Sequence, residues 1–332
     1  MVFSPLYISG FAQLWRPLAL AVGLLAAPGP ANAQAGETAP GFTLEVEGQL
    51  VFGASDFAAG LVPDFSPSGY HVLERDEGDG WGGALAIGYA WRNGWSAAVR
   101  YRRLEADTGG GPVEPIVVPF VPSLDIVPGG FPFPLADVLT RVESNASLLD
   151  VLASKDIPGG AGRLELFGGL TYATVDRDIT LIDCSCSGLA VHYGSTFEGV
   201  GPKVGFRGGI PLSGGLHLVG SGSAAVLFGT SEFRNSMSQP DGFGLDIAPV
   251  KDKDSRTVGA FDAEAGLAFP VGAGTLTVGY RIDAWLQALD SDQRVSEDFL
   301  FLGIPPIGDR HDDFVEHGPF ARFAMPLAGV GN

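Results

Sequence analysis

The stretch that decides the fold reads Trp81-Gly82-Gly83-Ala84-Leu85-Ala86-Ile87-Gly88-Tyr89-Ala90-Trp91, then Arg92-Asn93-Gly94, then Trp95-Ser96-Ala97-Ala98-Val99-Arg100-Tyr101-Arg102. In its first segment most large side chains alternate with glycine or alanine, which is the two-residue period of a β-strand. Asn93-Gly94 readily adopts positive φ angles, so we expect a tight hairpin turn there. In the returning segment Val99 and Tyr101 share one face, while Arg100 and Arg102 share the other. The two faces therefore suit different solvents.

The same alternation recurs along the chain. It is found at residues 44–52, 145–155, 163–175, 196–208, 215–229, 257–269, 274–287 and 314–326. Together with the hairpin, these segments predict about ten strands. The connections are short at residues 92–94, 156–162, 209–214 and 270–273, and long at residues 54–78, 106–144, 176–195, 230–256 and 288–313. Short turns at one end and long loops at the other are typical of bacterial membrane barrels. We therefore predict an all-β fold: a transmembrane, antiparallel up-and-down β-barrel with short periplasmic turns and long external loops.

The first part of the chain has the features of an export signal. Arg16 precedes an apolar run at residues 18–27, and Ala31-Asn32-Ala33 matches an A-x-A cleavage site. The apolar run is too short to cross a bilayer as a helix. We expect residues 1–33 to be a cleaved signal peptide and residues 34–332 to form a single barrel domain in the bacterial outer membrane.

Composition narrows the partners. The chain has 49 Gly, 24 Pro and 22 Phe, a net charge of -18 and a mean hydropathy of +0.21. The acidic balance argues against nucleic acid, which is bound by cationic surfaces. Outer-membrane lipid and lipopolysaccharide are the expected surroundings. Loop carboxylates are compatible with three roles: ligands of divalent cations that bridge to lipopolysaccharide phosphates, groups that bias a pore toward cations, or a solvated loop surface. The sequence leaves open whether the chain forms a homo-oligomer.

Charged residues within the strands are expected to face the barrel lumen, because a cation facing lipid at the midplane costs roughly 2–4 kcal/mol. The lumen-lining candidates are Glu45, Glu47, Arg100, Arg102, Asp150, Arg163, Glu165, Lys203, Arg207, Asp262, Glu264, Arg281, Asp283, Glu316 and Arg322. Ten strands fall between a filled barrel and a wide pore. We expect a narrow, water-containing lumen crossed by salt bridges; the alternative is a fully closed interior.

Neither catalysis nor a cofactor is indicated. The only compact acid and histidine cluster at the expected outer rim is His311-Asp312-Asp313, and neighbouring residues of an extended chain point in alternating directions. No nucleophile elbow, metalloprotease helix or phosphate loop occurs. Cys184 and Cys186 are expected to form a disulfide, with incidental thiols as the alternative and a metal site disfavoured. We therefore expect no enzyme activity, no cofactor and no metal.

Three stretches resemble the Legionella-type major outer membrane protein family. They are Phe197-Glu198-Gly199-Val200-Gly201-Pro202-Lys203-Val204-Gly205, Leu218-Val219-Gly220-Ser221-Gly222-Ser223-Ala224-Ala225-Val226-Leu227-Phe228-Gly229 and His317-Gly318-Pro319-Phe320-Ala321-Arg322-Phe323. Residues 263–267 and 277–281 also occur in the expected order, and residues 79–103 match more loosely. The resemblance implies a pore-forming outer-membrane barrel and no catalytic residues. The glycines of these strands also relieve crowding where strands bend to close a barrel.

The leading hypothesis for function is a porin-like channel that passes small hydrophilic solutes or ions. One alternative is a plugged structural or adhesive barrel that acts through its loops, and a third is a hydrolase at the outer rim. The longest loop, residues 106–144, is rich in Gly and Pro. It is compatible with an inward constriction, an apolar external tip or an exposed loop.

Overall fold

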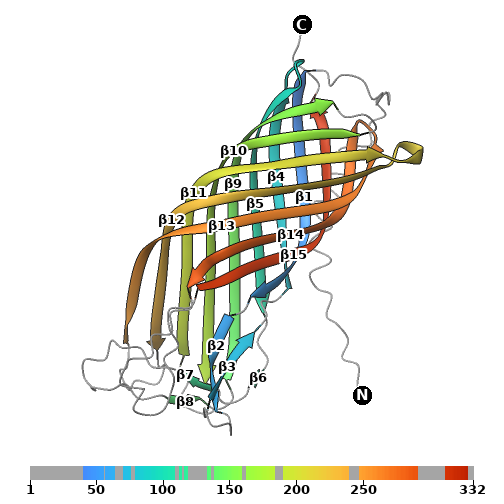
Figure 1. Cartoon of the computed structure of the whole chain (residues 1–332). Helices are drawn as coiled ribbons and strands as arrows, with labels where there is room; N and C mark the ends of the chain where they lie inside the picture. Colours follow the sequence, from blue (N-terminus) through green and yellow to red (C-terminus); the bar gives the residue numbers. More distant parts are fainter. Residues whose placement is uncertain are drawn as a thin grey trace, which may run out of the picture.

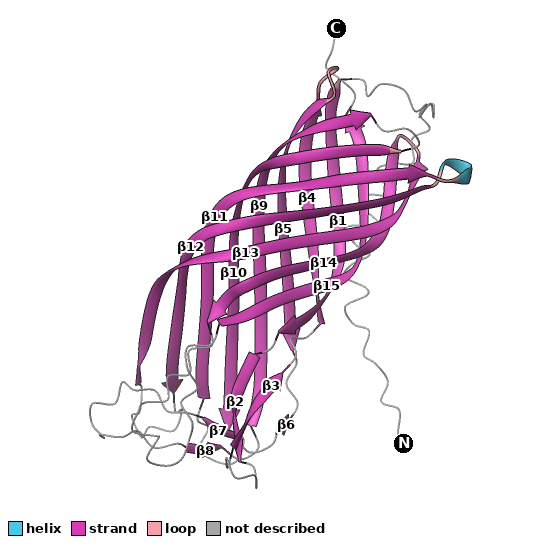
Figure 2. Cartoon of the chain, in the orientation of Figure 1, coloured by secondary structure: helices cyan, strands magenta, loops and turns pink. Residues whose placement is uncertain are grey.

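A computed structural model describes the chain at residues 40–55, 57–63, 70–75, 79–108, 112–113, 116–118, 133–135, 138–158, 162–183, 190–238, 247–290 and 311–327. Ten long strands form one closed antiparallel barrel (Figures 1 and 2). The ring closes through pairing of β10 with β9. The fold predicted from the alternation is therefore confirmed. The expected signal peptide and its cleavage site lie outside the described residues.

The ten barrel strands are, in ring order, β1 (Gly41–Ser55), β4 (Asp79–Ala90), β5 (Trp95–Thr108), β9 (Val138–Pro158), β10 (Arg163–Asp183), β11 (Ala190–Pro211), β12 (His217–Ser238), β13 (Ile247–Val271), β14 (Gly274–Asp290) and β15 (His311–Leu327). Each pairs with its sequence neighbours in the ring, and β15 pairs with β1. The Trp91–Trp95 connection is a tight turn in which Gly94 has φ 75°. Of the positive angles expected at Asn93-Gly94, the one at Gly94 occurs, whereas Asn93 does not have a positive φ.

The strands are strongly tilted. The pairing partners of Glu47, followed from strand to strand, reach β13 at Arg256 in one direction and at Ala268 in the other, twelve residues apart. This offset is the shear of the barrel, which is linked to the strand number and tilt. Side chains that are far apart in their strands' numbering therefore lie at the same level of the lumen.

The outer face of the barrel carries an apolar belt. Leu85, Leu170, Val204 and Phe206, on β4, β10 and β11, are each about half exposed. Large rings lie toward both edges of the belt: Trp81, Tyr101 and Tyr172 toward the long loops, and Phe42, Tyr89, Trp91 and Trp95 toward the short turns. Aromatic girdles at both interfaces are expected of a membrane barrel. No helix in the described part of the chain is long and apolar enough to span a membrane.

Several strands extend further toward the long loops than the alternation predicted. β9 to β13 contain 21 to 25 residues each, and residues 176–183, 190–195, 230–238 and 247–256 are strand where we predicted loop. The reason is that the barrel wall continues beyond the apolar belt. Both of its faces carry polar residues there, so the alternation of apolar and polar residues is lost while the backbone pairing continues.

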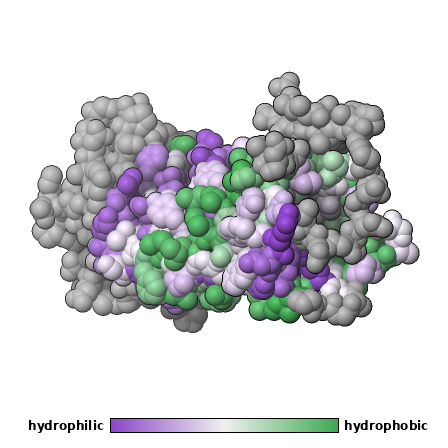
Figure 3. Space-filling model, turned by 90° about the horizontal axis from the view of Figure 1, so that it is seen from above, coloured by the Kyte–Doolittle hydropathy of each residue, from purple (hydrophilic) through white to green (hydrophobic). Residues whose placement is uncertain are grey.

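Segments of the long connections at residues 54–78 and 106–144 form a small second sheet. β2 (Phe57–Pro63), β3 (Tyr70–Arg75), β7 (Ile116–Val118) and β8 (Phe133–Leu135) form it, and β6 (Pro112–Val113) pairs with β9. The sheet lies at the long-loop end of the barrel (Figure 1). At the opposite end, the short helix η1 (Ser213–Gly215) joins β11 to β12, and the described surface is a patchwork of polar and apolar residues (Figure 3).

Candidate pore lining and its closure

A layer of charged side chains crosses the lumen at the level of the apolar belt. It is built by inward positions of β1, β5, β9, β11, β13, β14 and β15, because alternate residues of a strand face the same side. Eleven of the candidate residues take part in its ion pairs: Glu45, Glu47, Arg100, Arg102, Asp150, Lys203, Asp262, Glu264, Arg281, Asp283 and Arg322. We call this set the charged layer.

One half of the charged layer is centred on Glu47 and Glu264. Arg322 donates from Nε to Glu47 Oε2 at 2.7 Å and from Nη1 to Glu264 Oε1 at 2.8 Å. Arg281 also donates to both carboxylates. The Glu47 side chain is 0% exposed and that of Arg281 is 1% exposed. The lumen is therefore filled by paired charges at this point.

Arg100 and Glu45 complete this half. Arg100 Nη2 donates to Glu47 Oε2 at 2.9 Å, and Arg322 Nε lies 3.2 Å from Glu45 Oε1. The guanidinium groups of Arg281 and Arg322 lie 5.1 and 4.8 Å from the ring centre of Phe320, within reach of cation–π attraction. Three arginines thus meet three glutamates, and each cation contacts more than one carboxylate.

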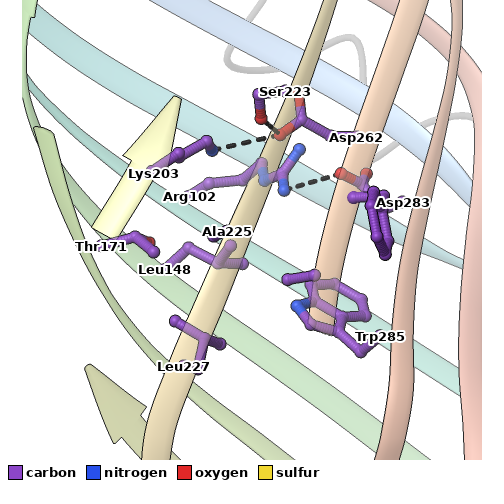
Figure 4. A pocket seen from close by; sticks show the side chains of 12 residues that line it. Arg102, Leu148, Thr171, Lys203, Ser223, Ala225, Leu227, Asp262, Asp283 and Trp285 are labelled. Atoms are coloured by element: carbon purple, nitrogen blue, oxygen red, sulfur yellow. Dashed lines mark hydrogen bonds and ion pairs between the residues drawn. The ribbon is translucent and has the colours of Figure 1, made fainter. Parts of the chain in front are cut away.

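The other half of the charged layer contains fewer cations than carboxylates. Arg102 Nη2 lies 2.8 Å from Asp283 Oδ1. Lys203 Nζ lies 3.2 Å from Asp150 Oδ2 and 3.1 Å from Asp262 Oδ2. Ser223 donates a hydrogen bond to Asp262. Figure 4 shows Arg102 and Lys203 reaching across toward Asp283 and Asp262.

The remaining candidates lie at other levels. Arg163 is at the short-turn end, where it donates to both carboxylate oxygens of Asp156 and is 60% exposed. Glu165 and Arg207 are partly buried directly opposite each other on β10 and β11. Glu316 is fully buried on β15, toward the long loops. These four residues therefore lie outside the charged layer.

A second layer, which the sequence did not reveal, lies next to the charged layer on its long-loop side. We call it the apolar layer; its larger members are Val51, Leu104, Leu148, Val175, Phe197, Leu227, Val258, Trp285, Leu289 and Phe314. Trp285 and Phe314 stack with ring centres 5.1 Å apart. In the sequence these inward residues alternate with lipid-facing residues that are also apolar. The two sets together form a continuous apolar run in which the alternation is not visible. One sequence signal could have revealed the apolar layer, since Trp285 follows Arg281 and Asp283 at inward positions of one strand.

Glycines make room for inward-facing rings. A Cβ on Gly205 would lie 2.4 Å from Phe167 Cζ, and one on Gly199 would lie 2.5 Å from Phe197 Cζ. Both distances are shorter than van der Waals contact allows. The glycines of β11 thus relieve crowding inside the barrel, as the sequence suggested.

Beyond the apolar belt, the outer face of the strand extensions carries exposed ion pairs. Arg103 donates to Glu105 at 2.7 Å, and Arg141 lies 2.7 Å from Glu143 and 3.2 Å from Asp107. Partial desolvation at the barrel wall raises the pKa of Asp178, and the carboxylates of Asp176 and Glu143 add to this rise. We call this outer surface the polar collar.

The structure describes little or nothing of the surroundings of the two cysteines and of the His311-Asp312-Asp313 cluster. Cys184 and Cys186 lie outside the described residues, and so do the side chains of His311 and Asp312. Asp313 accepts a hydrogen bond from the backbone of Gln287 at 2.9 Å. Within the described ranges, no group of three or more His, Cys, Asp or Glu side chains is arranged to hold a metal ion.

A closed ring of tilted strands with an apolar exterior and an ion-paired interior defines a transmembrane β-barrel protein. The family model described as Legionella pneumophila major outer membrane protein precursor matches residues 49–325. The chain therefore belongs to this family of outer-membrane proteins, as its three motifs suggested. A search of curated proteins found no match.

Solved structures similar to the barrel include several outer-membrane proteins. The outer membrane protease OmpT from Escherichia coli has 11% identity and a TM-score of 0.49, with 90% of this chain and 100% of that chain covered. The translocator domain of the autotransporter NalP from Neisseria meningitidis has 10% identity and a TM-score of 0.38, with 96% of each chain covered. The toluene transporter TbuX from Ralstonia pickettii has 8% identity and a TM-score of 0.35, with 88% and 90% covered.

Proposed function

We propose that the protein is a porin-like channel of low conductance for small ions or hydrophilic solutes, and that its path is closed in this conformation. The observation that carries the proposal is the charged layer, which crosses the lumen within the membrane. A buried ion pair is often no more stabilising than apolar residues of the same size. A barrel that only needed a plug would gain little from eleven charged residues, whereas charged rings are a usual lining of ion pathways.

The contacts of the charged layer also suit a gate. Arg281 contacts Glu47 and Glu264, and Arg322 contacts the same two carboxylates and Glu45. Because each arginine has more than one partner, one contact can be given up while another is kept. The apolar layer adds a second barrier in series, since apolar constrictions close ion paths by excluding water.

Single-channel recording in planar bilayers tests this proposal. The purified protein is expected to give brief openings of low conductance, and Glu47→Gln is expected to lengthen them because three arginines lose a shared partner. Glu165→Gln, which alters a lumen carboxylate outside the charged layer, is the matched control. Bilayers that stay silent with both wild type and Glu47→Gln, although inserted protein is recovered, would contradict the channel.

A closed surface barrel is the second candidate, and the packing of the apolar layer favours it. Leu104, Phe197, Leu227 and Phe314 are each 0% exposed, so opening would require an interior core to rearrange. In that case the function would be binding at the cell surface, through the small sheet of β2, β3, β7 and β8 and through the polar collar. Lipopolysaccharide and outer-membrane lipid are the surroundings proposed for the collar and the belt. Neither candidate function involves catalysis.

A further inference from the structure

The inner face of β12 carries mostly small side chains. Its inward residues over most of the barrel height are Ser221, Ser223, Ala225, Leu227, Gly229 and Ser231, of which Leu227 alone is large. The strands β14 and β15 differ, because they project arginine and aromatic side chains into the lumen: Arg281, Trp285, Phe314, Phe320 and Arg322. The wall formed by β12 therefore leaves more room in the lumen than β14 and β15 do.

Part of the room beside β12 is a small cavity. Ser223, Ala225 and Leu227 line it from β12, and Figure 4 shows Lys203 and Thr171 beside them. Its open space is about that of one water molecule. The strand β4 also has small inward residues, but there the room is taken: a Cβ on Gly82 would lie 2.3 Å from Leu104 Cδ2.

The cavity lies between the two barriers of the lumen. Lys203 borders it from the charged layer, and Leu227 borders it from the apolar layer. Thr171 is 2% exposed, and within the described residues its hydroxyl has no hydrogen-bond partner. Buried polar atoms without partners are rare, and water ordinarily satisfies them. The cavity therefore offers a polar group to which water in a path can bind.

Lys203 is the side chain of the charged layer that can move most readily. Its Nζ lies 3.2 Å from Asp150 Oδ2 and 3.1 Å from Asp262 Oδ2. A lysine ammonium is a compact charge on a flexible stem, so it can leave one carboxylate while it keeps the other. Arg322 is held more firmly, because Nη1 and Nη2 donate to the two oxygens of Glu264 and Nε donates to Glu47.

We propose that the path through the lumen follows the inner face of β12, and that Lys203 and Leu227 form its gate. The inference rests on the proposed channel function and says where that channel opens. A shift of Lys203 toward Asp150 opens the charged layer, a shift of Leu227 opens the apolar layer, and the cavity joins the two. Asp283 also borders the cavity and is the inward neighbour of Arg281, so a change at Glu47 reaches the path through Arg281.

Cysteine modification during single-channel recording tests the path. In a variant with Cys184→Ser and Cys186→Ser, Ser223→Cys places a thiol beside the cavity. A methanethiosulfonate reagent with a trimethylammonium group is expected to lower the current of its openings to less than about half, because the attached group narrows the path. Thr277→Cys, at an inward position directly opposite Arg322, is the matched control and should lose less than about a tenth.

Two results separate the path from the channel itself. Openings whose current is unchanged in Ser223→Cys, or equally reduced in Thr277→Cys, would overturn the path along β12 while the channel stands. Bilayers that stay silent with inserted wild-type protein would contradict the channel, and the path would fall with it.

A pair of leucine truncations tests the gate. Leu227→Ala is expected to raise the fraction of time spent open about twofold or more, because it removes the apolar part of the barrier. Leu104→Ala removes the same atoms from a fully buried position of the apolar layer that leans over β4, and should raise this fraction much less. Equal open fractions in the two variants would show a general loosening of the interior and would overturn the role of Leu227 in the gate.

Discussion

The charged layer and the apolar layer fill neighbouring levels of one lumen. On β14 they are adjacent, since Arg281 and Asp283 of the charged layer and Trp285 of the apolar layer are successive inward residues. Both layers are buried, yet they depend on their neighbours in different ways. A buried charge needs its specific partner, whereas an apolar side chain needs only contact and volume. Substitutions in the two layers should therefore differ in size, in additivity and in their response to a second change.

The largest effect is expected from Arg281→Met. The change leaves Glu47 and Glu264 short of a shared partner, and removing one member of a buried ion pair costs about 3–5 kcal/mol. Urea unfolding of the barrel in detergent measures the loss. Arg163→Met, at an ion pair that is largely exposed, should cost less than about 1 kcal/mol. Equal losses in the two variants would show that the charged layer is as well hydrated as the lumen mouth.

Leu227→Ala probes the apolar layer. Leu227 is fully buried and lines a small cavity where the charged layer meets the apolar layer, and truncating such a leucine costs about 2–5 kcal/mol because a void remains. We expect about 3 kcal/mol by the same unfolding measurement. Leu170→Ala, on the lipid-facing side, is the control, since lipid can fill the space that the side chain leaves. An equal loss of stability in Leu170→Ala would contradict the assignment of Leu227 to the packed interior and of Leu170 to the lipid-facing surface.

Paired replacement separates the two kinds of layer most clearly. Arg102→Met and Asp283→Leu should each be destabilising, because each leaves one buried charge alone. The double variant should come within about 1 kcal/mol of the wild type, since both charges are then gone. A double-mutant cycle on unfolding free energies measures the coupling. Additive losses would show that Arg102 and Asp283 do not depend on each other.

The smallest effect is expected in the polar collar. Because the pKa of Asp178 is raised in the folded protein, protonation of this residue favours the folded state. Stability should therefore rise slightly as the pH falls through that raised pKa, and Asp178→Asn should remove this part of the pH dependence. Thermal unfolding at several pH values measures it. An Asp178→Asn variant that keeps the full pH dependence would contradict the assignment.

The sequence predicted the ring, the strand order and the charged residues because lipid outside and charge inside produce a strict alternation. Glu47 and Arg281, 234 positions apart, could be assigned to one interior but not to one ion pair. Their meeting depends on the shear of the closed barrel, which no local pattern encodes. The apolar layer escaped notice for the opposite reason: Leu227 and Trp285 are apolar like their lipid-facing neighbours, so the alternation that marks a strand is weakest where both faces are apolar.

Thiol labelling tests most directly whether the lumen is closed. Both substitutions are made in a variant whose Cys184 and Cys186 are replaced by serine. Ala225→Cys places a thiol within the apolar layer, and Glu165→Cys places one on the short-turn side of the charged layer. A water-soluble thiol reagent is expected to modify the cysteine at position 165 to completion, while the one at position 225 stays almost unmodified. Equal rates of modification at the two positions would show a continuous water path and contradict the closed state.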